Sequence, residues 1–264
     1  MCDTILHGPI GVFDSGMGGL TVLKEIAALL PEQDILYFGD TARVPYGARS
    51  PTVIRRCVRE NVDFLMKQDI SALVVACNTA TAIALDDLTE YLSIPVFGVV
   101  EPSARCAVEV APHGVIAVLA TEATIESRAY EQVIRRFSKD ATVIGRSCPL
   151  FVPLAEEGWV ENEVAKRAAD IYLRDIRDRH VDAVVLGCTH YPLLTSTIAG
   201  ILGTDVKIID SAHATANEVA TALPKSLGTG RRKFFVTDAP ERFARIGSRF
   251  LEASISDVTR IDVC

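Results

Sequence analysis

The chain has 264 residues, 49% of them hydrophobic and 23% charged, which suits one large or two ordinary α/β domains and excludes a disordered protein. Its net charge of −7, from 27 basic and 34 acidic residues, argues against a dedicated nucleic-acid surface. No apolar run reaches the roughly 18 residues of a membrane span, so we expect no membrane contact. The first nine residues lack the basic and apolar segments of a secretory leader, and we therefore expect a cytoplasmic protein.

In the first hundred residues, short β-branched apolar runs alternate with segments of helical periodicity. The pattern predicts strands at 10–13, 34–38, 72–76 and 95–100, and helices at 21–30, 53–68 and 79–91. Residues 39–51 form a long loop rich in Gly, Pro and Arg. Strands that alternate with helices in this way predict a parallel sheet.

The same pattern restarts near residue 115. It predicts strands at 115–120, 142–145, 183–186 and 206–209, a loop at 147–153, and helices at 125–137, 161–178, 193–202 and 213–223. A last strand at 232–236 and a helix at 239–251 should pack back on the first half. We therefore predict two similar α/β lobes, the first formed by residues 1–99 plus 210–264 and the second by 100–209.

Two of the seven cysteines occupy matching positions. Cys77 and Cys188 each follow a buried β-branched run and precede a Thr and a helix start. Asp14, at the exit of the first strand, lies 63 residues before Cys77, and Thr121 lies 67 residues before Cys188, which suggests an internal repeat. Ligands bind beyond the carboxyl ends of such strands, so the two thiols can face each other across a shared cleft. That pair suits a reaction with an acid on one side of an atom and a base on the other.

Four further features mark candidate functional residues, and each has a plain structural alternative. Asp14 opens a Gly-rich corner that can hold an ammonium group or form a simple tight turn. The sequence 45–47, Pro-Tyr-Gly, lies in the long loop, which is either functional or a turn. Glu156 by itself is typical of a surface glutamate. His190, two residues after Cys188, can lower the pKa of that thiol or be structural.

The sequence predicts chemistry without a cofactor or a metal. No Lys stands at a strand exit like those of the two cysteines, and neither a Walker-A spacing nor a metal-ligand cluster occurs. The remaining cysteines are scattered and no Cys-x-x-Cys is present, so neither a disulfide framework nor a zinc site is expected.

Four motifs together resemble the glutamate racemases, a cofactor-independent family of the aspartate/glutamate racemase superfamily. They are Asp-Ser-Gly-x-Gly-Gly at 14–19, Pro-Tyr-Gly at 45–47, Ala-Cys-Asn-Thr-Ala at 76–80 and Gly-Cys-Thr-His-Tyr-Pro at 187–192, in the order of that family. The chain departs from the pattern at Ser103, where members often have Gly. The resemblance implies an α/β fold of two pseudo-symmetric flavodoxin-like lobes with mainly parallel sheets and the active site in the cleft between them.

The resemblance also implies interconversion of L- and D-glutamate, which supplies D-glutamate for peptidoglycan. Cys77 and Cys188 are then the two acid/base residues, assisted by Asp14, Glu156 and His190. The residues implied to bind substrate are Asp14, Ser15, Pro45, Tyr46, Gly47, Asn78, Thr79, Thr121, Thr189 and His190. No metal and no cofactor are implied.

Three alternatives stay open from the residues alone. The substrate can be aspartate or a related amino acid, or Cys188 and His190 can act as nucleophile and base of a different cysteine enzyme. The chain can also be a non-catalytic glutamate-binding module. A homodimer is a further open alternative, since the sequence does not decide the oligomeric state.

Overall fold

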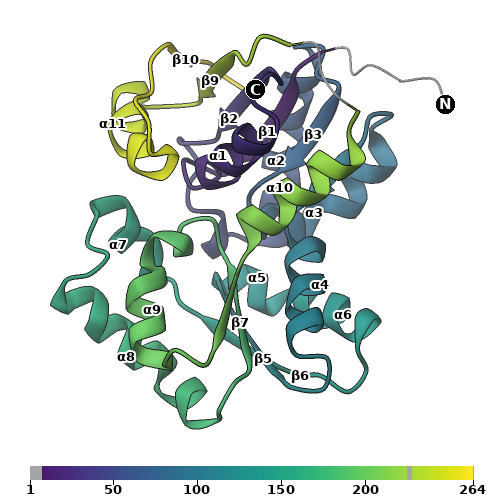
Figure 1. Cartoon of the computed structure of the whole chain (residues 1–264). Coiled ribbons are helices and arrows are strands. Elements are labelled where there is room, and N and C mark those ends of the chain that lie inside the picture. Colours follow the sequence, from purple (N-terminus) through teal and green to yellow (C-terminus); the bar gives the residue numbers. More distant parts are fainter. Residues whose placement is uncertain (1–7, 225–227, 264) are drawn as a thin grey trace.

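The chain folds into two lobes, each built on a parallel sheet (Figure 1). The computed structural model describes residues 8–224 and 228–263, so Cys2 and Cys264 lie outside the described residues. The first sheet has the strand order β10-β9-β2-β1-β3-β4 and the second has the order β6-β5-β7-β8. The strands are β1 (Ile10–Asp14), β2 (Ile35–Gly39), β3 (Ala72–Val75), β4 (Val96–Gly98), β5 (Val115–Ala120), β6 (Thr142–Ser147), β7 (Ala183–Gly187), β8 (Lys207–Asp210), β9 (Arg232–Val236) and β10 (Val258–Arg260).

The two lobes repeat one topology. The units β2-β1-β3-β4 and β6-β5-β7-β8 have the same strand order, and every strand pair in both sheets is parallel. The predicted fold class and internal repeat are confirmed. The C-terminal segment returns to the first lobe as expected, because β9 pairs with β2 and β10 pairs with β9.

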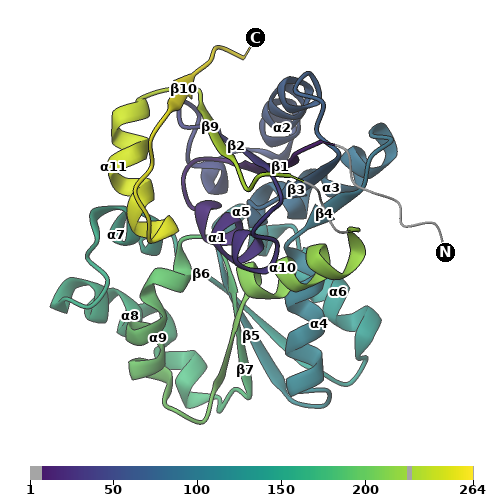
Figure 2. The same ribbon diagram turned by 45° about the horizontal axis from the view of Figure 1, so that its top comes forward.

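Helices cover both faces of each sheet. The described helices are α1 (Leu20–Leu29), α2 (Pro51–Met66), α3 (Asn78–Tyr91), α4 (Val100–Val110), α5 (Glu122–Glu126), α6 (Ala129–Phe137), α7 (Phe151–Glu157), α8 (Glu163–Asp178), α9 (Thr195–Leu202), α10 (Ser211–Ala222) and α11 (Pro240–Leu251), with the 3₁₀ turns η1 (Tyr46–Ala48) and η2 (Tyr191–Leu194). Helix α10 packs against α1 and α4, so it contacts elements of both lobes (Figure 2).

Two predictions fail where proline stands in the first turn of a helix. The expected strand at 95–100 is limited to β4, and α4 begins at Val100 with Pro102 in its first turn. The expected loop at 147–153 is interrupted by α7, with Pro153 in its first turn. Proline is tolerated there because the first backbone N–H groups of a helix have no partner within it.

Two smaller differences concern where elements break. The helix expected at 125–137 is divided into α5 and α6, because Arg128 adopts a left-handed conformation with φ of 56°. The short strand β10 was not expected from the sequence; it pairs with β9 and is mostly exposed, so its burial pattern is weak.

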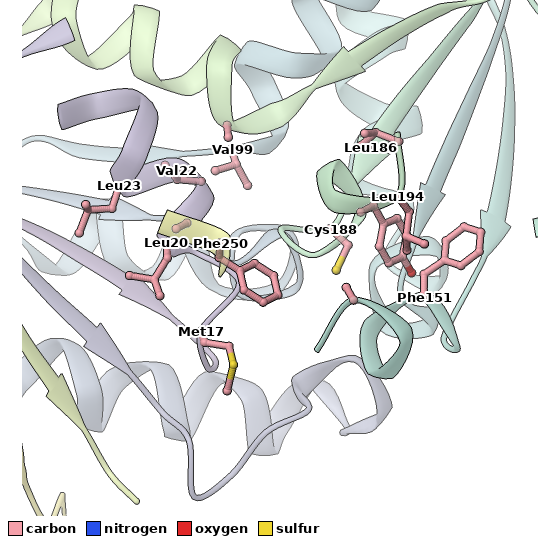
Figure 3. Close-up of a cluster of buried hydrophobic side chains, with 14 of the residues drawn as sticks. Met17, Leu20, Val22, Leu23, Val99, Phe151, Leu186, Cys188, Leu194 and Phe250 are labelled. Atoms are coloured by element: carbon pink, nitrogen blue, oxygen red, sulfur yellow. The ribbon is translucent and has the colours of Figure 1, made fainter. Parts of the chain in front are cut away.

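One hydrophobic cluster is continuous across both lobes. It includes Leu20 and Phe250 of the first lobe together with Phe151 and Leu194 of the second. Figure 3 shows Cys188 within this cluster, between the side chains of the two lobes. Burial of apolar surface therefore holds the ends of β3 and β7 near each other.

Candidate active site

Cys77 lies at the carboxyl end of β3 and caps the N-terminus of α3. Its sulfur accepts a hydrogen bond from the backbone N–H of Ala80 at 3.5 Å, and its thiol donates to the Ser15 hydroxyl at 3.4 Å. Burial raises the pKa of the Cys77 thiol to about 12, and the nearby charges of Asp14 and Cys188 add to this effect. Cys77 is therefore a protonated thiol at neutral pH.

Asp14 is fully buried beside Cys77, at the end of β1. Its Oδ2 atom accepts the backbone N–H of Gly16 at 2.9 Å, whereas Oδ1 has no hydrogen-bond partner among the described residues. Burial raises the pKa of the Asp14 carboxyl, although the charge of His190 and the backbone N–H groups of Gly16 and Gly19 partly oppose this. A buried acceptor without a partner is costly, so Oδ1 marks a place for a donor from a ligand.

Cys188 lies at the corresponding end of β7 and faces a chain of charged groups. Its sulfur is 3.9 Å from His190 Nδ1, and His190 Nε2 is 3.3 Å from Glu156 Oε1. Glu156 extends from α7, and its Oε2 accepts a hydrogen bond from Arg242 at 3.0 Å. His190 and Cys188 are thus neighbours in space as well as in the sequence, and Glu156 is only 12% exposed instead of lying on the surface.

His190 and Glu156 each stabilise the charged form of the other. Burial by itself lowers the pKa of His190, but hydrogen bonds with Cys188 and Glu156 outweigh it and raise that pKa to about 10. Burial acts to raise the pKa of Glu156, but the hydrogen bonds and charges of His190 and Arg242 prevail and lower it. At neutral pH the sulfur of Cys188 therefore lies beside an imidazolium that is paired with a carboxylate.

The two lobes touch at two glycines beside the cysteines. A Cβ added at Gly18 would lie 2.5 Å from His190 Nδ1, and one at Gly47 would lie 2.5 Å from the Thr121 Cβ. Only a residue without a side chain allows approaches this close. Thr21 Oγ1 also donates to the Thr189 carbonyl at 3.3 Å across the same interface.

Threonines from both lobes form a small hydroxyl cluster near Cys77. Thr79 Oγ1 is 2.8 Å from Thr121 Oγ1 and 3.1 Å from Thr124 Oγ1, and the latter two are 2.9 Å apart. Hydroxyls can both donate and accept, so the cluster can redirect its hydrogen bonds to a polar ligand. The structure thus brings Thr79 and Thr121 together, and Thr124 joins them without having been singled out from the sequence.

The loop 45–47 reaches the site through its backbone and not through the tyrosine hydroxyl. Tyr46 is 1% exposed, and its hydroxyl donates to the buried carboxylate of Asp40. Asn61 Nδ2 donates to the same carboxylate at 3.0 Å, and Thr237 Oγ1 does so at 3.0 Å. Pro45 and Tyr46 therefore support Gly47, the residue that contacts the second lobe.

Asn78 is held by Tyr130, which the sequence did not mark as a candidate, and Tyr130 in turn contacts Ser103. The Tyr130 hydroxyl donates to Asn78 Oδ1 at 2.7 Å and lies 3.2 Å from Ser103 Oγ. The Ser103 hydroxyl also donates to the Val99 carbonyl at 2.7 Å, which gives this departure from the family pattern a structural role. Asn78 Nδ2 is buried and has no partner among the described residues. Tyr130 carries no sequence signal, because its role depends on the contact between helices.

Within the described ranges, no group of three or more His, Cys, Asp or Glu side chains is arranged to hold a metal ion. No helix in the part of the chain that the structure describes has the length and apolarity to cross a membrane.

The repeated two-lobe fold with a cysteine at the end of each third strand defines a class of enzymes. Residues 10–219 match the family model described as Asp/Glu/Hydantoin racemase. A glutamate racemase of Geobacter metallireducens is 51% identical over 261 residues, which cover 96% of both chains.

Solved structures agree with this placement. A glutamate racemase of Bacillus anthracis superposes with a TM-score of 0.93 at 40% identity, over 98% of both chains. A glutamate racemase of Francisella tularensis, crystallised in complex with D-glutamate, gives a TM-score of 0.90 at 36% identity, over 97% of this chain and 98% of that one. The chain belongs to the Asp/Glu/Hydantoin racemase family, within its glutamate racemases, and the resemblance drawn from the four motifs is confirmed.

Proposed function

We propose that this chain interconverts L- and D-glutamate without a cofactor, with Cys77 and Cys188 as acid and base on opposite faces of the substrate Cα. The observation that carries the proposal is the matched placement of the two thiols at the ends of β3 and β7, in lobes that meet beside both of them. The product D-glutamate then serves peptidoglycan synthesis, as the family membership implies.

The unpartnered polar atoms support an amino acid as the substrate. Asp14 Oδ1 is a buried acceptor and Asn78 Nδ2 is a buried donor, and neither has a partner among the described residues. An α-ammonium group can donate to the first and an α-carboxylate can accept from the second. The complex of the Francisella tularensis relative with D-glutamate supports glutamate as the amino acid.

The reaction needs the two sulfurs in different protonation states. Starting from L-glutamate, the Cys188 thiolate removes the Cα proton, and the Cys77 thiol delivers a proton to the opposite face. The family membership supplies this assignment of faces, and the raised pKa of Cys77 supports its role as the acid at neutral pH. The step leaves Cys188 as a thiol and Cys77 as a thiolate, which is the state that accepts D-glutamate in the reverse direction. Before the next molecule of L-glutamate reacts, Cys188 gives a proton to solvent and Cys77 takes one up, so protons balance over the complete cycle.

The surroundings stabilise the charge that develops during proton removal. Electrons left on Cα delocalise into the α-carboxylate, and the Asn78 amide and the threonine hydroxyls are donors suited to that charge. Cys77 is 5% exposed and Cys188 is 6% exposed, so water is excluded and these interactions act in a medium of low dielectric constant.

The remaining substrate contacts and the lobe boundaries belong to the same proposal. We assign substrate binding to Asp14, Ser15, Pro45, Tyr46, Gly47, Asn78, Thr79, Thr121, Thr189 and His190, and assistance of the cysteines to Asp14, Glu156 and His190. The lobes divide as 1–99 plus 210–264 and 100–209. The enzyme acts in the cytoplasm, as is typical of glutamate racemases.

Exchange of the α-proton tests the proposal directly. The protein is incubated with L-glutamate in heavy water, and deuterium at Cα and the change in circular dichroism are followed together; L-aspartate is the control substrate. We expect deuterium to enter glutamate as optical activity is lost, with aspartate exchanging far more slowly.

Other outcomes support the alternatives. Faster exchange of aspartate would show that the enzyme prefers another substrate of the superfamily. Binding of glutamate without exchange would leave a binding module, and a covalent adduct on Cys188 that forms without Cys77 would indicate a nucleophilic cysteine enzyme.

A further inference from the structure

Helix α11 joins the two lobes at the Cys188 site. Its buried face, which includes Phe243 and Phe250, packs on the first lobe, where the Phe243 ring lies 5.7 Å from that of Tyr37. Its arginines reach α7 of the second lobe, above which α11 lies in Figure 1. The helix therefore packs on the sheet of the first lobe and contacts the second lobe through its arginines and through Phe250.

Two of these arginines bind the same residue. Arg242 Nη2 donates to the carboxylate of Glu156 at 3.0 Å, and Arg249 Nη1 donates to the Glu156 backbone carbonyl at 3.1 Å. Gly158 makes room for Arg249, since a Cβ added there would lie 2.7 Å from Arg249 Nη1. The Phe250 ring stands edge-on against the His190 imidazole, with the ring centroids 5.2 Å apart.

The Glu156 carboxylate uses its two oxygens for different lobes. Oε1 faces His190, which belongs to the second lobe together with Glu156, and Oε2 faces Arg242 of the first lobe. If the bond to Arg242 is lost, Oε2 keeps no hydrogen-bond partner among the described residues, and the carboxylate is held through Oε1 alone. The orientation of His190 toward Cys188 then loses its support.

We propose that Arg242 is a positioning residue for the Cys188 half of the site: it fixes Glu156, Glu156 fixes His190, and the approach of the two lobes thereby prepares one of the two bases. This inference rests on the proposed function. The Cys77 sulfur has no such connection to α11, because its partners are Ser15, Ala80 and Asp14 of the first lobe. Arg242 should thus act on one face of the substrate only.

Racemisation cannot reveal a one-sided effect. The two enantiomers have equal free energies, so any variant must change kcat/KM by the same factor in both directions. Elimination of halide from a β-halogenated glutamate is different, because one base removes the Cα proton, halide leaves Cβ, and the enamine hydrolyses to the 2-oxo acid and ammonia. The L-analogue reports on Cys188 and the D-analogue reports on Cys77.

The experiment therefore measures kcat/KM for elimination from both analogues in R242Q and R242M. We expect elimination from the L-analogue to fall roughly fivefold, the effect of a partly exposed ion pair, and elimination from the D-analogue to change by less than about twofold. R242K should keep most of the wild-type kcat/KM for the L-analogue, since an ammonium group can also donate the single hydrogen bond to Oε2. R245Q is the matched control, because Arg245 is an exposed arginine of the same helix with no ion pair among the described residues.

A double-mutant cycle decides whether Arg242 acts through Glu156. In an E156Q background, R242Q should have no further effect on the L-analogue. An equal loss for both analogues, no loss for either, or an undiminished effect in E156Q would each overturn the proposal. A wild-type protein that neither exchanges the α-proton of glutamate nor eliminates halide would instead refute the proposed function, so the two failures are distinguishable.

Discussion

Cys77 and Cys188 each follow the third strand of a unit with the same strand order, but the charges beside the two sulfurs differ. Asp14 lies near Cys77, and burial together with that carboxylate raises the pKa of Cys77 to about 12. His190 lies beside Cys188, and the pKa of that imidazole is raised to about 10. The sulfur of Cys77 therefore lies beside a hydroxyl, a backbone N–H and a buried carboxyl group, whereas the sulfur of Cys188 lies beside an imidazolium that Glu156 and Arg242 support.

The comparison shows how a repeated fold can support a reaction that needs two unlike groups. The sheet topology places both thiols at equivalent positions, whereas the side chains that surround each thiol place different charges beside it. In the first lobe the residue two positions after the cysteine is Thr79, and in the second it is His190. A racemase that begins with one acid and one base needs this inequality.

The largest effect should come from removing either sulfur. We expect C77S and C188S each to lower racemisation by about 10²–10⁴-fold, because a serine hydroxyl has too high a pKa to act as acid or base. C77S should still eliminate halide from the L-form of a β-halogenated glutamate, and C188S from the D-form. Steady-state rates with both forms measure this.

Equal loss of both eliminations in both variants would contradict the assignment of one sulfur to each face. Racemisation by either variant at the wild-type rate would contradict the two-thiol mechanism itself.

The glycines at the lobe interface should give the next largest effect. G18A places a methyl group against His190, and G47A places one against Thr121, so each keeps the lobes apart on one side of the site. We expect kcat/KM for racemisation to fall by about 10–10²-fold in each, as for a displacement of roughly 1 Å.

G200A is the matched control for these variants. Gly200 is an exposed residue of α9 with no atom within 4 Å of an added Cβ, so its activity should match that of wild type. Elimination assays should again separate the two sides, with G18A acting mainly on the L-analogue. Wild-type activity in G18A and G47A would show that the lobes need not approach this closely.

The pH dependence of stability should differ between the two sides. His190 has a pKa of about 10 instead of the ordinary 6.5. Its contribution to the free energy of unfolding is therefore complete below pH 6.5 and is lost as the pH rises through 10. Cys77 has a pKa of about 12 instead of 9.0, so its contribution is lost only above pH 9. Within each of these pH ranges, the free energy of unfolding can fall by about 1.4 kcal/mol per pH unit.

Urea unfolding of H190N, C77A and wild type between pH 6 and pH 11 measures these contributions. H190N should flatten the curve from pH 6.5 upward, and C77A should flatten it only above pH 9. A C77A curve parallel to that of wild type above pH 9 would show that the pKa of Cys77 is not raised.

The smallest effect should come from the Tyr46 hydroxyl. Y46F removes the hydrogen bond to Asp40 and the one that the hydroxyl accepts from Asn61 at 2.9 Å. The Asp40 carboxylate keeps Asn61, Arg43 and Thr237 as partners, so we expect a loss of only about 1–2 kcal/mol in unfolding free energy. Because the hydroxyl is buried and already paired with Asp40, KM for glutamate should change by less than about threefold. A large rise in KM would mean that the hydroxyl itself contacts substrate.

The sequence alone was sufficient for the strand–helix alternation, the repeat and the two cysteine corners. Local periodicity reveals buried parallel strands such as β3 and β7, because their side chains are apolar on both faces. Local periodicity did not reveal α4 and α7, because their first turns contain proline. Glu156 was therefore not placed on a helix.

Only the tertiary structure decided how the two cysteines differ. Arg242 lies 86 residues from Glu156 in the chain, and Tyr130 lies 52 residues from Asn78, so no local pattern links either pair. The protonation of Cys77 and His190 depends on burial and on charges brought from both lobes, and these quantities do not exist until the chain has folded. The sequence determined which residues can carry the chemistry, and packing between the lobes decided which of them carry charge.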